Sequence, residues 1–178
     1  TNVEGTYNIL EASKYLDIEQ TIITSTSEVY GSAKYVPIDE KHSLSAQSLY
    51  SASKISADQL AISYYNSFQL PIKIIRPFNI YGPRQSSRAV IPSIIIQALN
   101  NKKEIKLGNV KPTRDFTYVT DTCNAFLDIL KIKNFFGNSL NVGSNNEYTI
   151  KDIAKKVLAK VNSEAIIRKE ERRVRSEK

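Results

Sequence analysis

The chain has 178 residues, 41% of them hydrophobic, and a formal net charge of +7. This length and composition predict one domain with enough apolar side chains to form a core. Cys123 is the only cysteine, which excludes a disulfide framework or a cysteine metal site and suits a cytoplasmic protein. No apolar run is long enough to span a membrane, and no signal-peptide pattern opens the chain. The basic excess is compatible with nucleic-acid binding, but no basic patch with interleaved aromatic residues supports that class.

Expected helices and strands alternate along the chain. The first part predicts a helix from residue 3 to 16, a strand over 20–24, a loop over 31–47, a helix over 48–68 and a strand over 72–76. The second part predicts a helix over 89–100, a strand over 104–107, a helix over 119–130, a strand over 140–142, a helix over 150–161 and a strand over 165–167. Strands that alternate with helices predict an α/β fold with a parallel sheet covered by helices, the later half of a doubly wound domain.

Two neighbouring segments carry a candidate acid–base site. Tyr50 and Lys54 lie one helical turn apart, so they share a face of the expected helix. An ammonium beside a phenol favours the phenolate, so we expect Lys54 to lower the pKa of Tyr50. Thr26, Ser27 and Glu28 follow the end of a strand, where open α/β sheets place their chemistry. A phenol with a lowered pKa can exchange a proton with a sugar hydroxyl.

Four runs occur in a characteristic order: S-T-S-E-V-Y-G from Ser25, Y-S-A-S-K from Tyr50, R-P-F-N-I-Y-G-P-R from Arg76 and R-D-F-T-Y-V-T-D from Arg114. With them the chain closely resembles the extended short-chain dehydrogenase/reductase family of NAD-dependent nucleotide-sugar epimerases and dehydratases. The resemblance implies the C-terminal part of a Rossmann-like doubly wound sheet plus a small α/β substrate-binding region. It implies NAD as cofactor, a nucleotide sugar as substrate and a homodimer. We expect residues 1–76 to form part of the NAD-binding domain and 77–178 mainly the nucleotide-sugar-binding region, with the two interleaved.

The same resemblance implies roles for single residues. Tyr50 would be the general base at the sugar 4-hydroxyl, Lys54 would hold the nicotinamide ribose, and Thr26 would hydrogen-bond the same hydroxyl. Glu28 would remove the C5 proton once C4 is a ketone. Cofactor-binding candidates are Tyr50, Lys54, Pro77 and Asn2, and substrate-binding candidates are Ser27, Asn79, Arg88, Arg114 and Arg175. A guanidinium can bind a phosphate with two parallel hydrogen bonds, which favours Arg114 as the residue that holds the diphosphate of the nucleotide. No metal is expected.

Glu28 favours a 4,6-dehydratase, because epimerases of the family generally lack this carboxylate. Ser27 stands where dTDP-glucose dehydratases have an aspartate. The runs from Tyr50 and from Arg76 are most similar to dehydratases that act on UDP-N-acetylglucosamine and supply legionaminic-type sugars. The alternatives are a UDP-sugar 4-epimerase, a UDP-glucuronate decarboxylase, or a piece of such an enzyme without activity of its own.

Three further expectations concern missing and exposed features. The chain has no methionine and its six glycines include no G-x-G-x-x-G, so we expect it to be part of a longer protein. His42 falls in the expected loop and is predicted to be solvated. Ala57, Ala61 and Tyr65 are predicted to form the outer, dimer-forming face of their helix.

Overall fold

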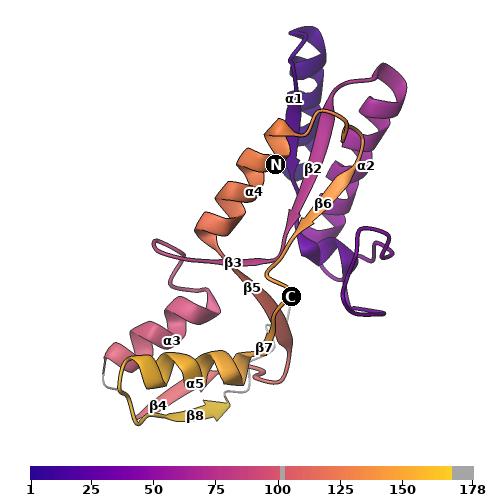
Figure 1. The fold of residues 1–178 in the computed structure, drawn as a ribbon. Coiled ribbons are helices and arrows are strands. Elements are labelled where there is room, and N and C mark those ends of the chain that lie inside the picture. Colours follow the sequence, from indigo (N-terminus) through magenta and orange to yellow (C-terminus); the bar gives the residue numbers. More distant parts are fainter. Residues whose placement is uncertain (101–102, 170–178) are drawn as a thin grey trace. The chain divides into compact units, whose positions relative to one another are not determined.

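The computed structural model describes residues 1–100 and 103–169, which form two compact units. The first unit comprises Thr1–Ile80 and Thr117–Asn145, and the second comprises Tyr81–Phe116 and the described residues from Asn146 onward. Each unit is therefore built from two separate stretches of the chain (Figure 1). The functional division at residue 76 stays a prediction.

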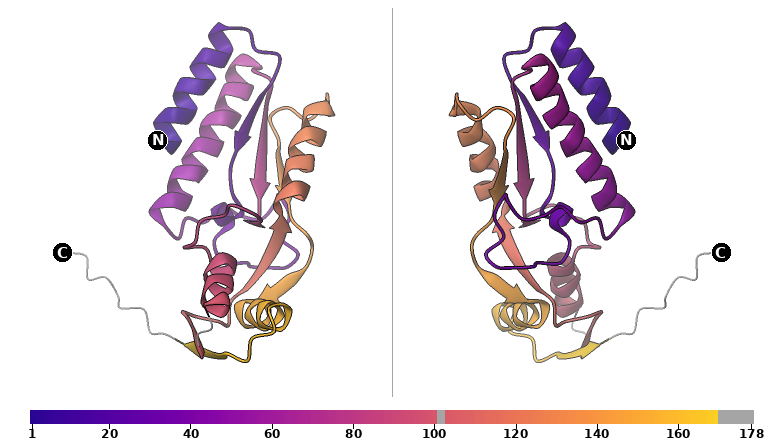
Figure 2. Two further views of the ribbon diagram at one scale, coloured as in Figure 1. Left: turned by 90° about the vertical axis from the view of Figure 1, so that its left-hand side faces the viewer. Right: turned by 90° about the vertical axis from the view of Figure 1, so that its right-hand side faces the viewer.

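The first unit contains a parallel sheet with helices on both faces. Its strands are β1 (Thr21–Thr24), β2 (Ile72–Pro77) and β6 (Ser139–Val142), in the order β1-β2-β6. Helices α1 (Asn2–Tyr15) and α2 (Leu49–Phe68) lie side by side on one face, and α4 (Val119–Lys131) covers the other (Figure 2). This arrangement confirms the predicted α/β class with a parallel sheet.

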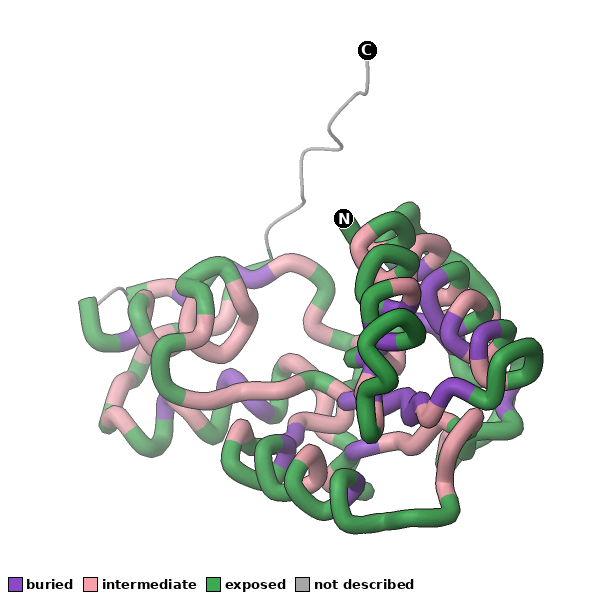
Figure 3. The backbone as a smooth tube through the Cα atoms, turned by 90° about the horizontal axis from the view of Figure 1, so that it is seen from above, coloured by how far each residue is buried: buried purple, intermediate pink, exposed green. Residues whose placement is uncertain are grey.

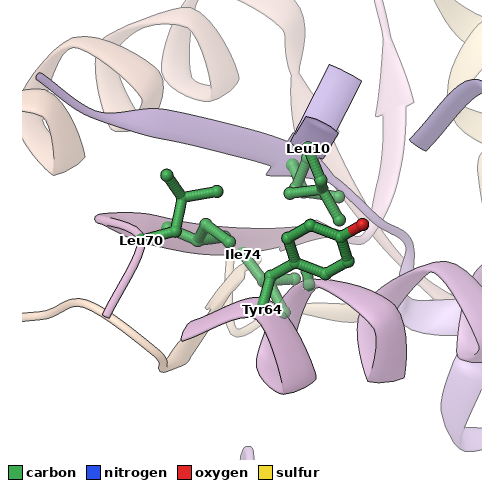
Figure 4. Close-up of a cluster of buried hydrophobic side chains, with 7 residues drawn as sticks. Leu10, Tyr64, Leu70 and Ile74 are labelled. Carbon is green, nitrogen blue, oxygen red and sulfur yellow. The ribbon is translucent and has the colours of Figure 1, made fainter. Parts of the chain in front are cut away.

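Strand β2 lies between β1 and β6, and its burial matches this central position. All six of its residues are buried, although Lys73 and Arg76 interrupt the apolar run. A strand that is covered on both faces reads as a nearly continuous apolar run. The helix and strand side chains that pack here form the cluster shown in Figure 4, which consists of Leu10, Ile23, Ala61, Tyr64, Leu70, Ile72 and Ile74. Most residues of α1, by contrast, are exposed (Figure 3).

Two expectations about exposure are wrong. Ala57 and Ala61 are only 2% and 0% exposed, so they belong to the interior of this unit and not to an outer face. Ala61 packs in the cluster that joins α2 to β1 and β2. His42 is 2% exposed, its Nε2 accepts a hydrogen bond from the Lys34 amide at 2.9 Å, and its ring packs edge-on against Tyr30. The loop thus folds over its histidine and does not leave it in water.

The second unit combines two helices with two strand pairs. Helix α3 (Val90–Leu99) packs against α5 (Ile150–Lys160), and strand β4 (Glu104–Leu107) pairs in parallel with β8 (Ile166–Lys169). Strand β5 (Thr113–Tyr118) pairs antiparallel with β7 (Glu147–Thr149) through Thr113–Asp115, and its last two residues belong to the first unit. Its core holds Ile94, Ala98, Ile105, Leu107, Ile153, Ala154 and Leu158. Thr149 and Asp152 form the expected reciprocal cap at the start of α5.

Four short elements were not predicted: the single-turn 3₁₀ helix η1 (Ser27–Tyr30) and strands β3 (Asn79–Tyr81), β5 and β7. Strands β3 and β7 have three residues each and η1 has four, too few to show a hydrophobic period, and β5 begins with the polar residues Thr113, Arg114 and Asp115. Pairing partners, and not sequence pattern, determine such strands. None of the helices within residues 1–100 and 103–169 has the length and apolar character to span a membrane.

Candidate active site

The carboxyl ends of β1 and β2 bring two site segments to one edge of the parallel sheet. Strand β1 ends at Thr24, and the next amide, that of Ser25, donates to the Ile75 carbonyl oxygen at 2.7 Å. Strand β2 ends at Pro77, which is buried. Open α/β sheets bind ligands outside this edge. The segment that begins at Ser25 therefore starts where such a sheet offers a site.

Helix α2 presents Tyr50 and Lys54 near the same edge. Ser48 caps the helix, because its side chain accepts from the Ser51 amide and the Ser51 hydroxyl accepts from the Ser48 amide. Tyr50 follows in the first turn and is 46% exposed. The half-buried Lys54 donates from its Nζ to the Thr24 carbonyl oxygen at 2.9 Å. The lysine therefore fixes the first turns of α2 to the end of β1.

The segment after β1 places two further side chains beside Tyr50. Thr26 caps η1, with its Oγ1 accepting from the Glu28 amide at 3.2 Å. Burial is the largest cause that raises the pKa of the Tyr50 phenol, the negative charge of Glu28 raises it further, and hydrogen bonding with the Thr26 side chain lowers it. Each effect requires proximity. The structure thus brings Thr26, Glu28, Tyr50 and Lys54 together.

The expectation that Lys54 lowers the pKa of Tyr50 is wrong for the chain as it stands. The pKa is raised, and Lys54 is not among the groups that shift it. The physical reason is that burial of the phenol, and next the carboxylate of Glu28, disfavour the phenolate, while the Lys54 ammonium donates to the backbone oxygen of Thr24.

Three of the remaining candidates lie in the same unit. Asn2, at the start of α1, donates to the Ser53 hydroxyl at 2.9 Å, and that hydroxyl donates to the Tyr50 carbonyl oxygen at 2.7 Å. Asn2 is therefore linked to the turn that carries Tyr50. Ser27 is the half-buried first residue of η1, and Asn79 is exposed at the start of β3.

Two arginine candidates belong to the second unit. Arg88 is exposed before α3, and its amide donates to the Ser86 hydroxyl at 3.3 Å. Arg114 is exposed on β5, and its Nη1 donates to the carbonyl oxygen of its neighbour Thr113 at 2.7 Å. Arg175 lies outside the described residues.

A buried polar network next to the site was missed. The Arg76 Nε and Nη2 atoms both lie 3.0 Å from Asp58 Oδ2, and Arg76 Nη1 donates to the Tyr30 hydroxyl at 2.9 Å. Two signals could have revealed it: an arginine in the otherwise apolar strand β2, and an aspartate one helical turn after Lys54. In the part of the chain that is described, no cluster of His, Cys, Asp and Glu could hold a metal ion.

Comparison with known proteins places the chain in a family. The family described as GDP-mannose 4,6 dehydratase matches residues 1–178. A dTDP-D-glucose 4,6-dehydratase of Dictyostelium discoideum is 40% identical over 168 residues, which cover 88% of this chain and 38% of the relative. The dTDP-D-glucose 4,6-dehydratase of Homo sapiens is 35% identical over 157 residues, which cover 88% of this chain and 45% of the relative. The chain spans about half the length of such relatives.

Solved structures give the same result. The UDP-glucuronic acid 4-epimerase of Bacillus cereus, in complex with UDP-glucuronic acid and NAD, has a TM-score of 0.90 at 31% identity, with 96% of this chain and 55% of that chain covered. The dTDP-glucose 4,6-dehydratase of Bacillus anthracis, in complex with NAD, has a TM-score of 0.86 at 35% identity, with 97% and 57% covered. The chain therefore belongs to the GDP-mannose 4,6 dehydratase family, whose matched relatives are Rossmann-like nucleotide-sugar dehydratases and epimerases.

Proposed function

We propose that the full-length protein that includes this chain is an NAD-dependent nucleotide-sugar 4,6-dehydratase that acts on a sugar similar to UDP-N-acetylglucosamine. The observation that carries the proposal is the proximity of the Glu28 carboxylate to the Tyr50 phenol. A dehydratase needs a base for the C5 proton in addition to a base for the 4-hydroxyl, and these two groups supply both. Similarity to dTDP-glucose dehydratases supports the reaction class. The UDP-N-acetylglucosamine preference is supported by the residue runs that start at Tyr50 and Arg76.

The residues present fit one end of the cofactor. Lys54 and Asn2 lie at or beside the first turns of α2, and Pro77 ends β2 at the sheet edge where dinucleotides bind. These residues would hold the nicotinamide end. The six glycines form no G-x-G-x-x-G, so the residues of this chain do not include the backbone turn that binds a pyrophosphate. NAD, when bound, supplies the acceptor for the C4 hydride and returns that hydride to the sugar.

The proton transfers follow from the positions of the side chains. Tyr50 would take the proton of the 4-hydroxyl as a phenolate, a form that the chain alone disfavours and that the positive charge of a bound nicotinamide would favour, and Thr26 would hold the same oxygen by a hydrogen bond. The resulting C4 ketone acidifies the C5 hydrogen, and Glu28 takes that proton. The C6 hydroxyl would leave as water with a proton that balances the one taken from the 4-hydroxyl, and a C5–C6 double bond would form. Glu28 can then return its proton to C5 when the hydride returns to C6.

The test is Glu28→Gln in the full-length protein with NAD and UDP-N-acetylglucosamine. Carbon NMR of the reaction would detect the 4-keto-6-deoxy product, and a substrate with deuterium at C4 would report hydride transfer. We expect the product to disappear while deuterium is still lost from C4 to the cofactor. A variant that forms product at the wild-type rate would contradict the proposal.

A 4-epimerase is the second candidate, because the epimerase of Bacillus cereus has a TM-score of 0.90 with this chain. The same assay separates the two reactions. An epimerase would form the C4 epimer, release no water from C6 and be little affected by Glu28→Gln.

We also propose that the full-length protein is a homodimer that pairs through α1 and α2. Large apolar side chains are exposed on both helices, among them Tyr7 at 46%, Ile9 at 55% and Leu49 at 92%. Partner helices that cover these side chains would remove their apolar surface from water, which favours association. Light scattering of the wild-type protein and of Ile9→Glu should give the masses of a dimer and a monomer, respectively. A wild-type monomer would contradict the proposal.

A further inference from the structure

The buried Asp58–Arg76 ion pair lies in the first unit directly after the catalytic turn of α2. The Asp58 side chain is 0% exposed and the Arg76 side chain 4%. Such a pair is weak evidence for stability, because the desolvation of two charges offsets much of their attraction. Its presence in the interior of the unit therefore points to a requirement for fixed geometry.

On one side the pair is part of the helix that carries the candidate base. Asp58 follows Lys54 by one helical turn, and the Lys54 charge lowers the pKa of the Asp58 carboxyl, although burial raises it overall. The Ser25 side chain also lowers the pKa of Asp58, so it lies beside the carboxyl. Neither Ser25 Oγ nor Asp58 Oδ1 has a hydrogen-bond partner among the described residues.

On the other side the pair holds the segment that carries Thr26 and Glu28. The Tyr30 hydroxyl accepts from Arg76 at 2.9 Å and donates to Asn141 Oδ1 at 2.7 Å, so a donor and an acceptor fix its orientation. Tyr30 is 0% exposed and ends η1. The opposite end of the segment is fixed by the hydrogen bond from the Ser25 amide to Ile75. Thr26 and Glu28 lie between these two anchors.

We propose that Tyr30, held by Arg76 and Asp58, is a positioning residue that sets the distance of Glu28 and Thr26 from Tyr50. This inference rests on the proposed function, since it assigns the network to the same acid–base site. Functional groups hold their geometry only when the residues behind them are fixed by packing and hydrogen bonds. Burial raises the pKa of Tyr30, so its hydroxyl remains a donor to Asn141 at neutral pH.

The test measures how strongly Glu28 acts on Tyr50. Carbon NMR of protein labelled at the tyrosine ring carbon that bears the hydroxyl gives the pKa of Tyr50, once Tyr50→Phe has identified its signal among the tyrosines. The groups that act on Tyr50 are Glu28 in η1 and Thr26, which caps η1, and the nearest charged residue on its own helix is Lys54, one turn away. The change in this pKa on Glu28→Gln measures the Glu28–Tyr50 coupling in the full-length protein, without substrate.

Tyr30→Phe removes only the buried hydroxyl, and Tyr35→Phe is its matched control. The Tyr35 hydroxyl belongs to the same loop but donates at the surface to Asp39 at 2.7 Å. We expect Tyr30→Phe to reduce the coupling to about half or less, and Tyr35→Phe to leave it unchanged. With substrate, Tyr30→Phe should lower kcat by on the order of tenfold and leave KM within about twofold.

A purely structural role would give a different result. Tyr30→Phe would then lower the melting temperature and leave both the coupling and kcat of the folded protein at wild-type values, which would overturn the inference. Asn141→Leu, which removes the acceptor of the Tyr30 hydroxyl, provides a second variant if Tyr30→Phe does not fold. Absence of dehydration in the wild-type protein would refute the proposed function instead, because the coupling is measured without turnover.

Discussion

The Lys54 ammonium donates a hydrogen bond of 2.9 Å to the carbonyl oxygen of Thr24, which joins α2 to the end of β1. In this geometry the lysine stabilises the contact between helix and strand more than it stabilises a Tyr50 phenolate. Burial and Glu28 raise the pKa of Tyr50, and only Thr26 lowers it. The pKa of the phenol is therefore set first by its burial and then by two side chains of the segment after β1.

This balance predicts how single substitutions move the pKa of Tyr50 in the protein without ligands. Glu28→Gln should lower it, because a negative charge next to the phenolate is removed. Thr26→Val should raise it, because the hydrogen bond to the phenol is lost. Lys54→Met should change it less than either. Carbon NMR titration of labelled tyrosine provides the measurement, and a dominant effect of Lys54→Met would contradict this account.

Gly31 has a conformation and surroundings that exclude a side chain. Its φ is +66°, and an added Cβ would lie 2.6 Å from the Ser45 carbonyl oxygen. We expect Gly31→Ala to lower the free energy of unfolding by about 1–3 kcal/mol and to disturb the loop after η1. Chemical denaturation provides the measurement.

Gly5→Ala is the matched control for Gly31→Ala. Gly5 lies inside α1, and an added Cβ would have no neighbour within 4 Å. Alanine favours a helix over glycine, so this variant should gain up to about 1 kcal/mol. Equal effects of the two substitutions would show that the structure around Gly31 is not as described.

Tyr64 gives a prediction for alkaline pH. Its hydroxyl donates to Glu11 Oε1, and this hydrogen bond raises the pKa of Tyr64 to about 12 from an ordinary value of 10.0. Because this pKa is higher in the folded than in the unfolded protein, the protonated hydroxyl contributes its full stabilisation below pH 10. That contribution is lost as the pH rises towards 12. Tyr64→Phe should therefore lower the melting temperature at pH 8, and its difference from wild type should shrink above pH 10.

Tyr15→Phe is the control for the Tyr64 substitution, because Tyr15 is 89% exposed. Differential scanning calorimetry at a series of pH values gives the comparison. A difference between Tyr64→Phe and wild type that does not depend on pH would contradict the role of the hydroxyl.

The cap of α5 predicts a change in the second unit. Thr149 Oγ1 accepts from the Asp152 amide at 3.0 Å, and hydrogen bonding by Thr149 is the largest cause that lowers the pKa of Asp152. Thr149→Ala should destabilise α5 by about 1 kcal/mol at neutral pH. A carboxyl whose pKa is lower in the folded than in the unfolded protein stabilises the fold at pH values above its pKa in the unfolded protein. This stabilisation is lost as the pH falls through the pKa in the folded protein. The difference from wild type should therefore diminish in acid.

Amide hydrogen exchange resolved along the chain locates this effect. We expect faster exchange in α5 for Thr149→Ala and no change for Thr120→Ala, which removes an exposed hydroxyl in the first turn of α4. Unchanged exchange in α5 for Thr149→Ala would show that the cap contributes little.

The long helices could be predicted because their information is local, whereas the roles of the site residues were inferred from the resemblance to a family and stay predictions. Helix α2 was predicted from residue 48 and α5 from residue 150, each with a serine or threonine at its start, and both begin within one residue of these positions. The pairing of Tyr50 with Lys54 follows from the helical repeat alone.

Only the tertiary structure determined which groups act on one another. From the sequence Tyr50 has Lys54 as its neighbour, but in the fold its pKa is set first by burial and then by Glu28 and Thr26, which come from another segment. The burial of His42 and the network of Tyr30, Arg76 and Asp58 depend in the same way on elements distant in the sequence. Periodicity and capping are properties of neighbouring residues, whereas desolvation and charge depend on what folds against a side chain.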